Sequence, residues 1–255
     1  VGGTDKLNKF EIFEAAKQAK INIGLFSGLI QAGTLSSLTG NNSRARLVLE
    51  AQSYNILTDR EKRVAKALVP EYGDDILTII SLALKDEKSL MGDDNRPFMN
   101  NKRQETFKKK YLPYKEIYNL NRGSDNDDFA SWYFEKQLLG YSYSKKLKDT
   151  LKSQNQRNMI TARESRKLDS NQFVKIVGTV KSCVKRTSSN GNKYYFIVSE
   201  DETGEFKCMF MEREYQKYLD KGNSLPEKGS IAIFTGRSSD STIFANDVNV
   251  LDNKI

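Results

Sequence analysis

The chain of 255 residues is 29% charged and 38% hydrophobic, carries a net charge of +8 and contains no histidine. This composition is typical of a soluble globular protein with one large domain or two ordinary ones. The lack of histidine excludes Ser-His-Asp and Cys-His catalysis and imidazole metal sites. No apolar run approaches the roughly 18 residues of a membrane span, and the N-terminus has no signal-peptide apolar region, so we expect a cytoplasmic protein without a membrane partner.

Residues 1–90 show the apolar periodicity of helices. The stretch FEIFEAAKQA (10–19) carries a stripe at helical spacing, and INIGLFSGLIQAGTLSSL (21–38) carries a second one, which Gly33 can end. This second stripe is expected to consist of Leu25, Leu29 and Ile30. Three more helices are expected to begin after Asn42 or Ser43, after Thr58 and after Asp75. We therefore predict an all-helical domain over residues 1–90.

Residues 91–170 are expected to be a basic helical and linker region. Residues 102–170 hold 16 basic and 9 acidic side chains, whereas residues 1–101 hold 13 of each and residues 171–255 hold 12 and 11. An aperiodic loop over residues 88–101 precedes a basic helical stretch with interleaved aromatic residues. Most of the positive charge therefore lies in the middle of the chain.

A second helix in this region is predicted to begin at Asp127 or Asp128. Its apolar face is expected to comprise Phe129, Trp132, Tyr133, Leu138 and Leu139. The run SKKLKDTLKSQNQRNMITARESRKL (144–168) is basic and poor in apolar residues, so it is either a linker or an exposed helix, with a domain boundary near Asp169.

The last third of the chain, residues 171–255, has the pattern of an oligonucleotide-binding (OB) barrel. Five short β-runs cover residues 174–185, 193–200, 205–211, 230–237 and 242–250, and a helical stretch, EREYQKYL, lies between the third and the fourth. A five-stranded Greek-key barrel with a ligand on the second and third strands has this order. The predicted fold class is therefore α+β, with an N-terminal all-helical region followed by a C-terminal five-stranded OB-fold β-barrel.

The sequence offers no convincing metal or catalytic centre. The adjacent acids Asp74-Asp75, Asp93-Asp94 and Asp127-Asp128 all fall in loops or cap positions, where capping or solvation explains them. Cys183 and Cys208 lie in predicted strands and are expected to be buried thiols rather than a disulfide or zinc ligands. We expect no cofactor, no metal and no catalytic residue in this chain.

Three stretches, in the same order, resemble the C-terminal part of the bacterial replicative DNA polymerase III alpha subunit. INIGLFSGLIQAGTLSSL resembles the end of that family's helix-hairpin-helix region, FEKQLLGYSYS (134–144) resembles its Glu-Lys-Glu-Leu-Leu-Gly-Phe-Tyr-Leu-Ser segment, and residues 174–211 resemble its OB domain. The matching positions in the first two stretches are Asn22, Leu29, Ile30, Ala32, Gly33, Glu135, Lys136, Leu138, Leu139 and Gly140. Those in the third are Gly178, Gly191, Lys193, Phe196, Glu200, Asp201, Gly204 and Phe210.

The resemblance implies a bacterial or phage replication module rather than a complete polymerase. Lys145-Lys146-Leu147 replaces the family's Gly-His-Pro-Leu, and neither Gln52 nor Gln104 begins a good sliding-clamp peptide, so docking on the clamp or on other replisome proteins is a weak expectation. Two-metal nucleotidyl transfer needs paired carboxylates on a rigid strand, and the sequence has none. We expect no polymerase activity from this chain alone.

The expected nucleic-acid site follows from strand alternation and from a second resemblance. Phe206, Cys208 and Phe210 form an apolar set that must be core, which leaves Lys207 outward. The OB domains of aminoacyl-tRNA synthetases, which this segment also resembles, direct the aromatic at the Phe196 position toward nucleic acid. Tyr194 and Phe196 are therefore expected to stack on bases, although burial of Phe196 in the core is the open alternative.

Cations are expected to contact the phosphates around these rings. On the barrel, Lys193 and Lys207 lie on the strands, Lys185 and Arg186 are expected in the first loop, and Arg237 ends the fourth run. In the basic middle region, duplex DNA is expected to meet Lys108, Lys109, Lys110, Lys145 and Lys146. A solvated surface is the alternative for each of these residues taken alone.

These observations predict a non-catalytic module that binds single-stranded template DNA on the OB face and duplex DNA through the helical region. The rival is a protein-interaction adaptor in which the barrel is structural and the Trp132 helix or the loop over residues 88–101 docks on a partner. The two differ in whether the face that carries Tyr194 and Phe196 is open and basic.

Overall fold

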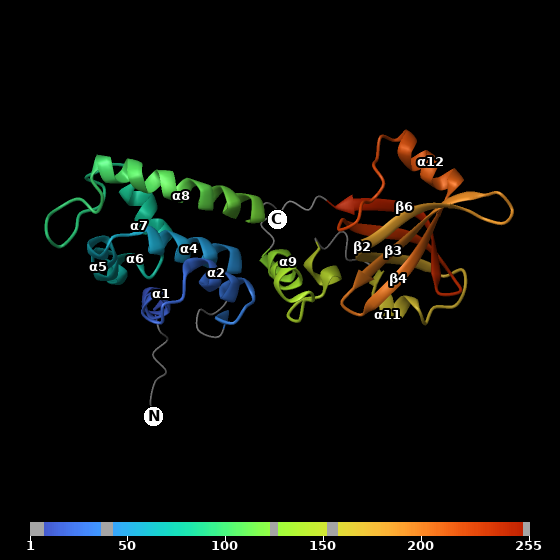
Figure 1. Cartoon of the computed structure of the whole chain (residues 1–255), viewed down its shortest axis with the longest axis horizontal. Coiled ribbons are helices and arrows are strands. Elements are labelled where there is room, and N and C mark those ends of the chain that lie inside the picture. The colour runs from blue at the N-terminus through green and yellow to red at the C-terminus, as the bar shows by residue number, and fades with distance from the viewer. Residues whose placement is uncertain (1–7, 37–42, 123–126, 152–157, 252–255) are drawn as a thin grey trace, which may run out of the picture. The chain divides into compact units, whose positions relative to one another are not determined.

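The computed structural model describes residues 8–36, 43–122, 127–151 and 158–251 (Figure 1). The chain divides into two compact units, Val1–Gly140 and Tyr141–Lys254, and each is described by itself below. The first is helical and the second is built on a closed β-barrel, so the fold class is α+β, as predicted. Independent domains with boundaries near residues 90 and 170 stay a prediction.

The described part of the first unit is helical. The bounds of its helices are α1 (Lys9–Gln18), α2 (Ile23–Gln31), α4 (Arg44–Ile56), α5 (Asp59–Ala67), α6 (Val69–Tyr72), α7 (Ile76–Ala83), α8 (Asn101–Arg122) and α9 (Asp127–Leu139). A connection over residues 84–100 lies between α7 and α8. Within the described ranges, no helix is both long and apolar enough to cross a membrane.

Polar side chains fix where these helices begin. Asn8 and Thr58 each form a reciprocal capping box with the glutamate three residues later, while Ser43 and Asp75 accept hydrogen bonds from backbone amides of the first turn. The predicted starts at Ser43, Thr58 and Asp75 are thus confirmed. The alternative cap Asn42 lies outside the described residues.

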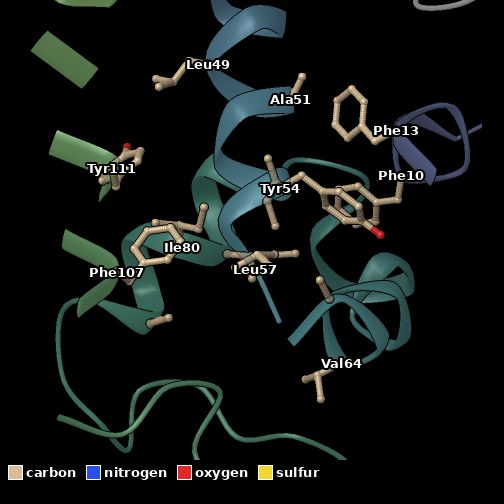
Figure 2. Close-up of a cluster of buried hydrophobic side chains, with 14 of the residues drawn as sticks. Phe10, Phe13, Leu49, Ala51, Tyr54, Leu57, Val64, Ile80, Phe107 and Tyr111 are labelled. Atoms are coloured by element: carbon tan, nitrogen blue, oxygen red, sulfur yellow. The ribbon is translucent and has the colours of Figure 1, made fainter. Parts of the chain in front are cut away.

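Helix α4 runs through the core of the first unit (Figure 2). Tyr54 stacks on Phe10 with ring centroids 5.2 Å apart, and Phe13 lies against the same ring at 5.5 Å. On the opposite side of α4, Phe107 and Tyr111 of α8 close the core. Aromatic rings from three helices therefore supply much of the buried apolar area of this unit.

The expected apolar stripes were only partly right. Phe26 and Ile30 are the buried apolar residues of α2, whereas Leu25 is 57% exposed, and on α9 Leu138 and Leu139 are 48% and 43% exposed. Trp132, in contrast, is buried. Short helices have too few turns for residue spacing alone to fix which face meets the core.

Buried ion pairs join the helices of this unit. Lys9 Nζ lies 2.6 Å from Glu50 Oε2, Arg46 binds the other oxygen of Glu50 at 3.0 Å, and Arg44 lies 2.6 Å from the buried Glu135. Burial raises the pKa of Glu50 even though two cations flank it. Breaking a buried ion pair by removing one partner typically costs about 3–5 kcal/mol, so these pairs help to fix which helix faces meet.

Among the adjacent acids, Asp75 serves as a cap, as expected, whereas Asp94 and Asp127 bind side chains of other elements. Asp75 caps α7 and binds Arg46, and Asp94 pairs with Arg60 at 2.7 Å, a hydrogen bond that lowers the pKa of Asp94 to about 2. The side chain of Asp127 accepts a hydrogen bond from Ser43 at 2.6 Å. Among the residues that the structure describes, no three Asp, Glu, Cys or His side chains are grouped as metal ligands would be.

The second unit has the strand order of an OB fold. Its elements are η1 (Leu147–Thr150), β1 (Met159–Ile160), α11 (Ala162–Ser165), β2 (Phe173–Thr187), β3 (Lys193–Asp201), β4 (Gly204–Met211), α12 (Glu212–Asp220), β5 (Ile231–Ser239) and β6 (Thr242–Leu251). The sheet runs β2-β3-β4-β6-β5 and closes because β5 also pairs with β2. Strand β4 pairs with β6 in parallel, the other barrel pairings are antiparallel, and the helix follows the third barrel strand, as in OB barrels.

Alternating side chains of these strands fill the barrel. Phe206, Cys208 and Phe210 of β4 are buried, which confirms the inward face predicted from the sequence, and Tyr215 and Tyr218 of α12 pack on the same core. Neither Cys183 nor Cys208 forms a disulfide, and burial raises the pKa of both thiols, of which Cys208 is buried and Cys183 half-buried.

The segment before the barrel is not the linker or exposed helix that was expected. Met159 and Ile160 add a short parallel strand to β2, Ala162 enters the barrel core, and Leu147 is fully buried. Thr161 caps α11, and Asp201 of β3 accepts a hydrogen bond from the Ala162 amide at 2.7 Å. A few apolar residues are enough to hold this segment in place, because they pack against the barrel.

Candidate nucleic-acid interface

The outer face of the barrel carries a continuous row of apolar side chains. Strand register places Val184 of β2 opposite Phe196 of β3, Phe196 opposite Met209 of β4, and Met209 opposite Phe244 of β6. We refer to Val184, Phe196, Met209 and Phe244 as the outer row. Direct cross-strand partners have Cβ atoms about 4.5–5.5 Å apart, so the row is a contiguous strip across four strands.

Burial confirms that the outer row faces away from the barrel core. The neighbours in sequence, Ile197, Cys208 and Ile243, are buried, whereas Phe196 and Met209 are half-buried and Val184 and Phe244 are exposed. Phe196 is thus on the outward face that was expected, and the alternative that it is core is wrong. OB folds bind their ligands on the second and third barrel strands, here β3 and β4, and an outward ring such as Phe196 is a platform on which bases can stack.

Arg186 lies over the ring of Phe196. Its guanidinium carbon is 4.6 Å from the ring centroid, and Arg186 is the cross-strand partner of Tyr194. This cation–π contact holds a positive charge against the aromatic strip. Arg186, Tyr194 and Phe196 therefore form one cluster, in which a base can meet a ring and a phosphate can meet the guanidinium.

The position of Arg186 corrects the expectation that it lies in a loop. β2 extends to Thr187 and pairs with Lys193, so Lys185 and Arg186 are strand residues, and the turn is confined to residues 188–192. Gly191 closes that turn with a φ of +79°, which glycine adopts without strain. The polar composition of this stretch suggested a loop, but the pairing of Lys185 and Arg186 with β3 keeps it in a hairpin.

Alternation separates the predicted lysines of this hairpin from the rings. Lys185 and Lys193 have the parity of Tyr195 and Ile197, and the ammonium of Lys185 lies 5.6 Å from the ring centroid of Tyr215. They point to the side of the hairpin that faces α12, opposite Tyr194 and Phe196. Lys207, in contrast, lies across from Val198 on the outward face of β4 and is exposed.

Arg237 lies at the far end of the outward surface. It is the register partner of both Phe244 and Phe173, and Phe173 is 59% exposed. One terminal nitrogen of Arg237 donates to the Asn171 carbonyl at 2.9 Å, so this guanidinium also holds the turn that leads into β2. Phe244 and Phe173 continue the aromatic surface toward Arg237, and the sequence prediction missed both.

The predicted lysines of the middle region belong to separate units. Lys108 is half-buried and lies 3.6 Å from Glu105, and Lys109 and Lys110 are exposed, all on α8 of the first unit. Lys145 and Lys146 precede η1 in the second unit, where Lys145 is half-buried. The three lysines of α8 thus belong to the first unit, and Lys145 and Lys146 belong to the second.

Two features bear on the adaptor alternative. Trp132, which belongs to the helix expected to dock on a partner, is 3% exposed and packs against Phe129 within its own unit. Gln104, one of the two glutamines considered for clamp docking, is buried, and its amide donates to the Ala83 carbonyl at 2.8 Å. The side chains of Trp132 and Gln104 are therefore both buried in the folded protein.

Comparison with known proteins leaves the family open. No protein-family profile and no curated protein match the sequence. Solved structures similar to part of this chain, each at a TM-score of 0.28, include the mitochondrial single-stranded DNA-binding protein Rim1 of S. cerevisiae, yeast Stn1 with Ten1, and the tRNA agmatidine synthetase TiaS in its apo form. Their identities are 17%, 14% and 19%, over 34%, 55% and 37% of this chain and 99%, 60% and 21% of theirs. The OB assignment rests on strand order and register, and not on these likenesses.

Proposed function

We propose that the second unit binds single-stranded nucleic acid, with DNA as the favoured substrate, on the outward face of its OB barrel. The observation that carries this proposal is the outer row of Val184, Phe196, Met209 and Phe244, with the Arg186 guanidinium set against it. A solvated surface does not require four apolar side chains aligned across four strands. Bases can stack on the rings of Phe196 and Phe244 without regard to sequence, while Val184 and Met209 offer apolar contact beside them.

The charges around the outer row suit a phosphate backbone. Three cations lie on the outward face: Arg186 near Val184, Lys207 near Met209 and Arg237 beside Phe244. In the described strands, no carboxylate is a direct cross-strand partner of an outer-row residue. The acids Glu200 and Glu205 lie farther along β3 and β4, where Lys181 forms ion pairs with both, at 3.3 and 2.7 Å. Lys185 and Lys193 would meet a strand that wraps around the hairpin tip.

In the wider proposal, the chain is a non-catalytic module of a replicative polymerase III alpha type from a bacterium or phage. The three sequence stretches that resemble that family support this reading, and Lys109 and Lys110, with Lys108 beside them, supply charge for duplex DNA or replisome partners. The adaptor function is the second candidate, and burial of Trp132 removes that side chain from the docking surface of its helix.

Salt dependence of binding to a fluorescently labelled oligothymidylate tests this proposal. Each phosphate neutralised on a single strand contributes about −0.7 to the slope of log Kobs against log [salt], so three outward cations predict a slope of about −2. Lys207→Ala should reduce the magnitude of the slope by about 0.7. The matched control is Lys221→Ala, an exposed lysine at the end of α12, which should leave the slope unchanged. Equal effects of the two substitutions would count against the outward face.

A further inference from the structure

Two adjacent cavities lie on the first unit, far in the sequence from the barrel. One, of about 200 Å³, is bounded by α1, α2 and α4, and the other, of about 510 Å³, lies between α1 and α5. Lys17 and Lys62 line both cavities, so the two spaces share a wall. Neither cavity belongs to the proposed OB interface.

The smaller cavity has apolar walls with an amide rim. Phe13, Phe26 and Tyr54 line it, and the first and last of these rings lie against each other in the core (Figure 2). The side chains of Asn22 and Asn55 also line it, and both residues are exposed. Its volume is below the roughly 300–1,000 Å³ of sites for drug-sized ligands, so it suits a single planar ring system with heteroatoms at its edge.

The larger cavity is lined mainly by cations. Lys17, Lys62, Arg63 and Lys66 face two acids, and both acids already have partners, because Glu14 binds Lys66 and Tyr54 while Asp59 binds Lys17 at 3.3 Å. Lys62 has the greatest burial of these cations, at 6% exposed, and its ammonium lies 5.3 Å from the ring centroid of Tyr54. In the part of the chain that the structure describes, no carboxylate lies within ion-pair distance of Lys62.

The backbone at the cavity edge gives an independent indication. α1 ends in a Schellman motif, in which the amide of Ile21 donates to the Ala16 carbonyl and that of Lys20 to the Lys17 carbonyl. Glycine usually occupies the left-handed position of this motif, yet Lys20 holds it with a φ of +57°. Lys20 thus has a strained backbone conformation, and its cationic side chain lines the smaller cavity.

We propose that these cavities bind a nucleoside phosphate, with the base in the smaller cavity against the wall that Phe13, Phe26 and Tyr54 line, and the phosphate among Lys17, Lys20 and Lys62. Several cations with no carboxylate to spare favour a phosphate over a carboxylate, because a phosphate carries more charge. Desolvation lowers the pKa of Lys62, and an anion beside it would restore the charged form. The nucleoside phosphate is either free in solution or the 5′ end of a strand.

Calorimetric titration of the full chain with 5′-dAMP, 5′-dTMP, deoxyadenosine and inorganic phosphate tests this site. The nucleotides should bind at least tenfold more tightly than phosphate or the nucleoside, and Lys62→Met should weaken nucleotide binding at least tenfold. Oligothymidylates with and without a 5′-phosphate distinguish the two sources, because only an end-binding site prefers the phosphorylated strand. Equal affinity for phosphate and nucleotides, or no nucleotide binding, would overturn the proposal.

Lys20→Gly separates binding from folding. Glycine relieves the left-handed strain, so this variant should raise the melting temperature and yet weaken nucleotide binding several-fold. The matched control is Lys85→Met, an exposed lysine after α7 that lines neither cavity. A Lys20→Gly variant that binds nucleotides as the wild type does would contradict the phosphate placement. Lys17, Lys20 and Lys62 all lie outside the barrel. Failure of this site would therefore leave the proposed OB function untouched, and failure of the OB function would leave this site untouched.

Discussion

Replacing Tyr194 and Phe196 together by alanine should lower the affinity for a single-stranded oligonucleotide by about 30-fold or more. A stacked ring contributes about 1–3 kcal/mol per base, and two rings at the lower limit give about 2 kcal/mol. Both side chains lie on the outward face of β3, so their removal spares the barrel core, which Ile197 and Ser199 of the same strand enter. Fluorescence anisotropy at low salt, with a labelled oligothymidylate, measures the change.

The matched control for the double substitution is Tyr141→Ala. Tyr141 is 61% exposed and belongs to the same unit, but it lies outside the barrel strands. It should bind the oligonucleotide with wild-type affinity. If the double variant also retained wild-type affinity, or if the control lost as much, the outer row would not be the stacking surface.

Gly236→Ala should destabilise the barrel by about 3 kcal/mol, a typical cost of forcing an atom into filled space. A Cβ at Gly236 would lie 2.0 Å from the backbone carbonyl oxygen of Phe244, at the point where the β5–β6 register shifts. Backbone cannot rotate away as a flexible side chain can, so β6 has to move. Urea unfolding followed by hydrogen exchange of the barrel strands measures the loss.

The same substitution should weaken single-strand binding, because Phe244 is a member of the outer row. Gly28→Ala is the control: a Cβ there meets nothing within 4 Å, and alanine in the α2 helix should stabilise the first unit by about 0.5–1 kcal/mol. A Gly236→Ala variant whose barrel unfolds at the wild-type urea concentration would contradict the register of β5 and β6.

The barrel could be predicted from the sequence because its signals are local. Alternation in residues 205–211 identified the inward face of β4, and the turn at Gly191 and the helix at residues 212–219 interrupt the strands where expected. The outer row could not be predicted in full, since it depends on cross-strand register over four strands. Alternation in TIFANDVNV, which buries Ile243 and Ala245, could have identified Phe244 as outward.

Other sequence predictions were wrong where contacts between residues distant in the sequence determine the local structure. Lys185 and Arg186 read as loop residues because they are polar, but pairing with β3 keeps them in a strand. The segment before the barrel has no apolar period, yet Leu147 and Ala162 are buried by an existing sheet. The cavities of the first unit arise from the packing of α1, α2, α4 and α5, which no residue pattern reports.

Photo-crosslinking tests the central proposal most directly. The full chain would be irradiated with an oligonucleotide in which 5-iodouracil replaces each thymine in turn, and the crosslinked peptides would be identified by mass spectrometry. The outward face predicts crosslinks concentrated on Tyr194 and Phe196 of β3 and on Phe244, which lies in the outer row with Phe196. Crosslinks confined to Tyr195 and Tyr215 on the α12 side, or to the first unit, would contradict it.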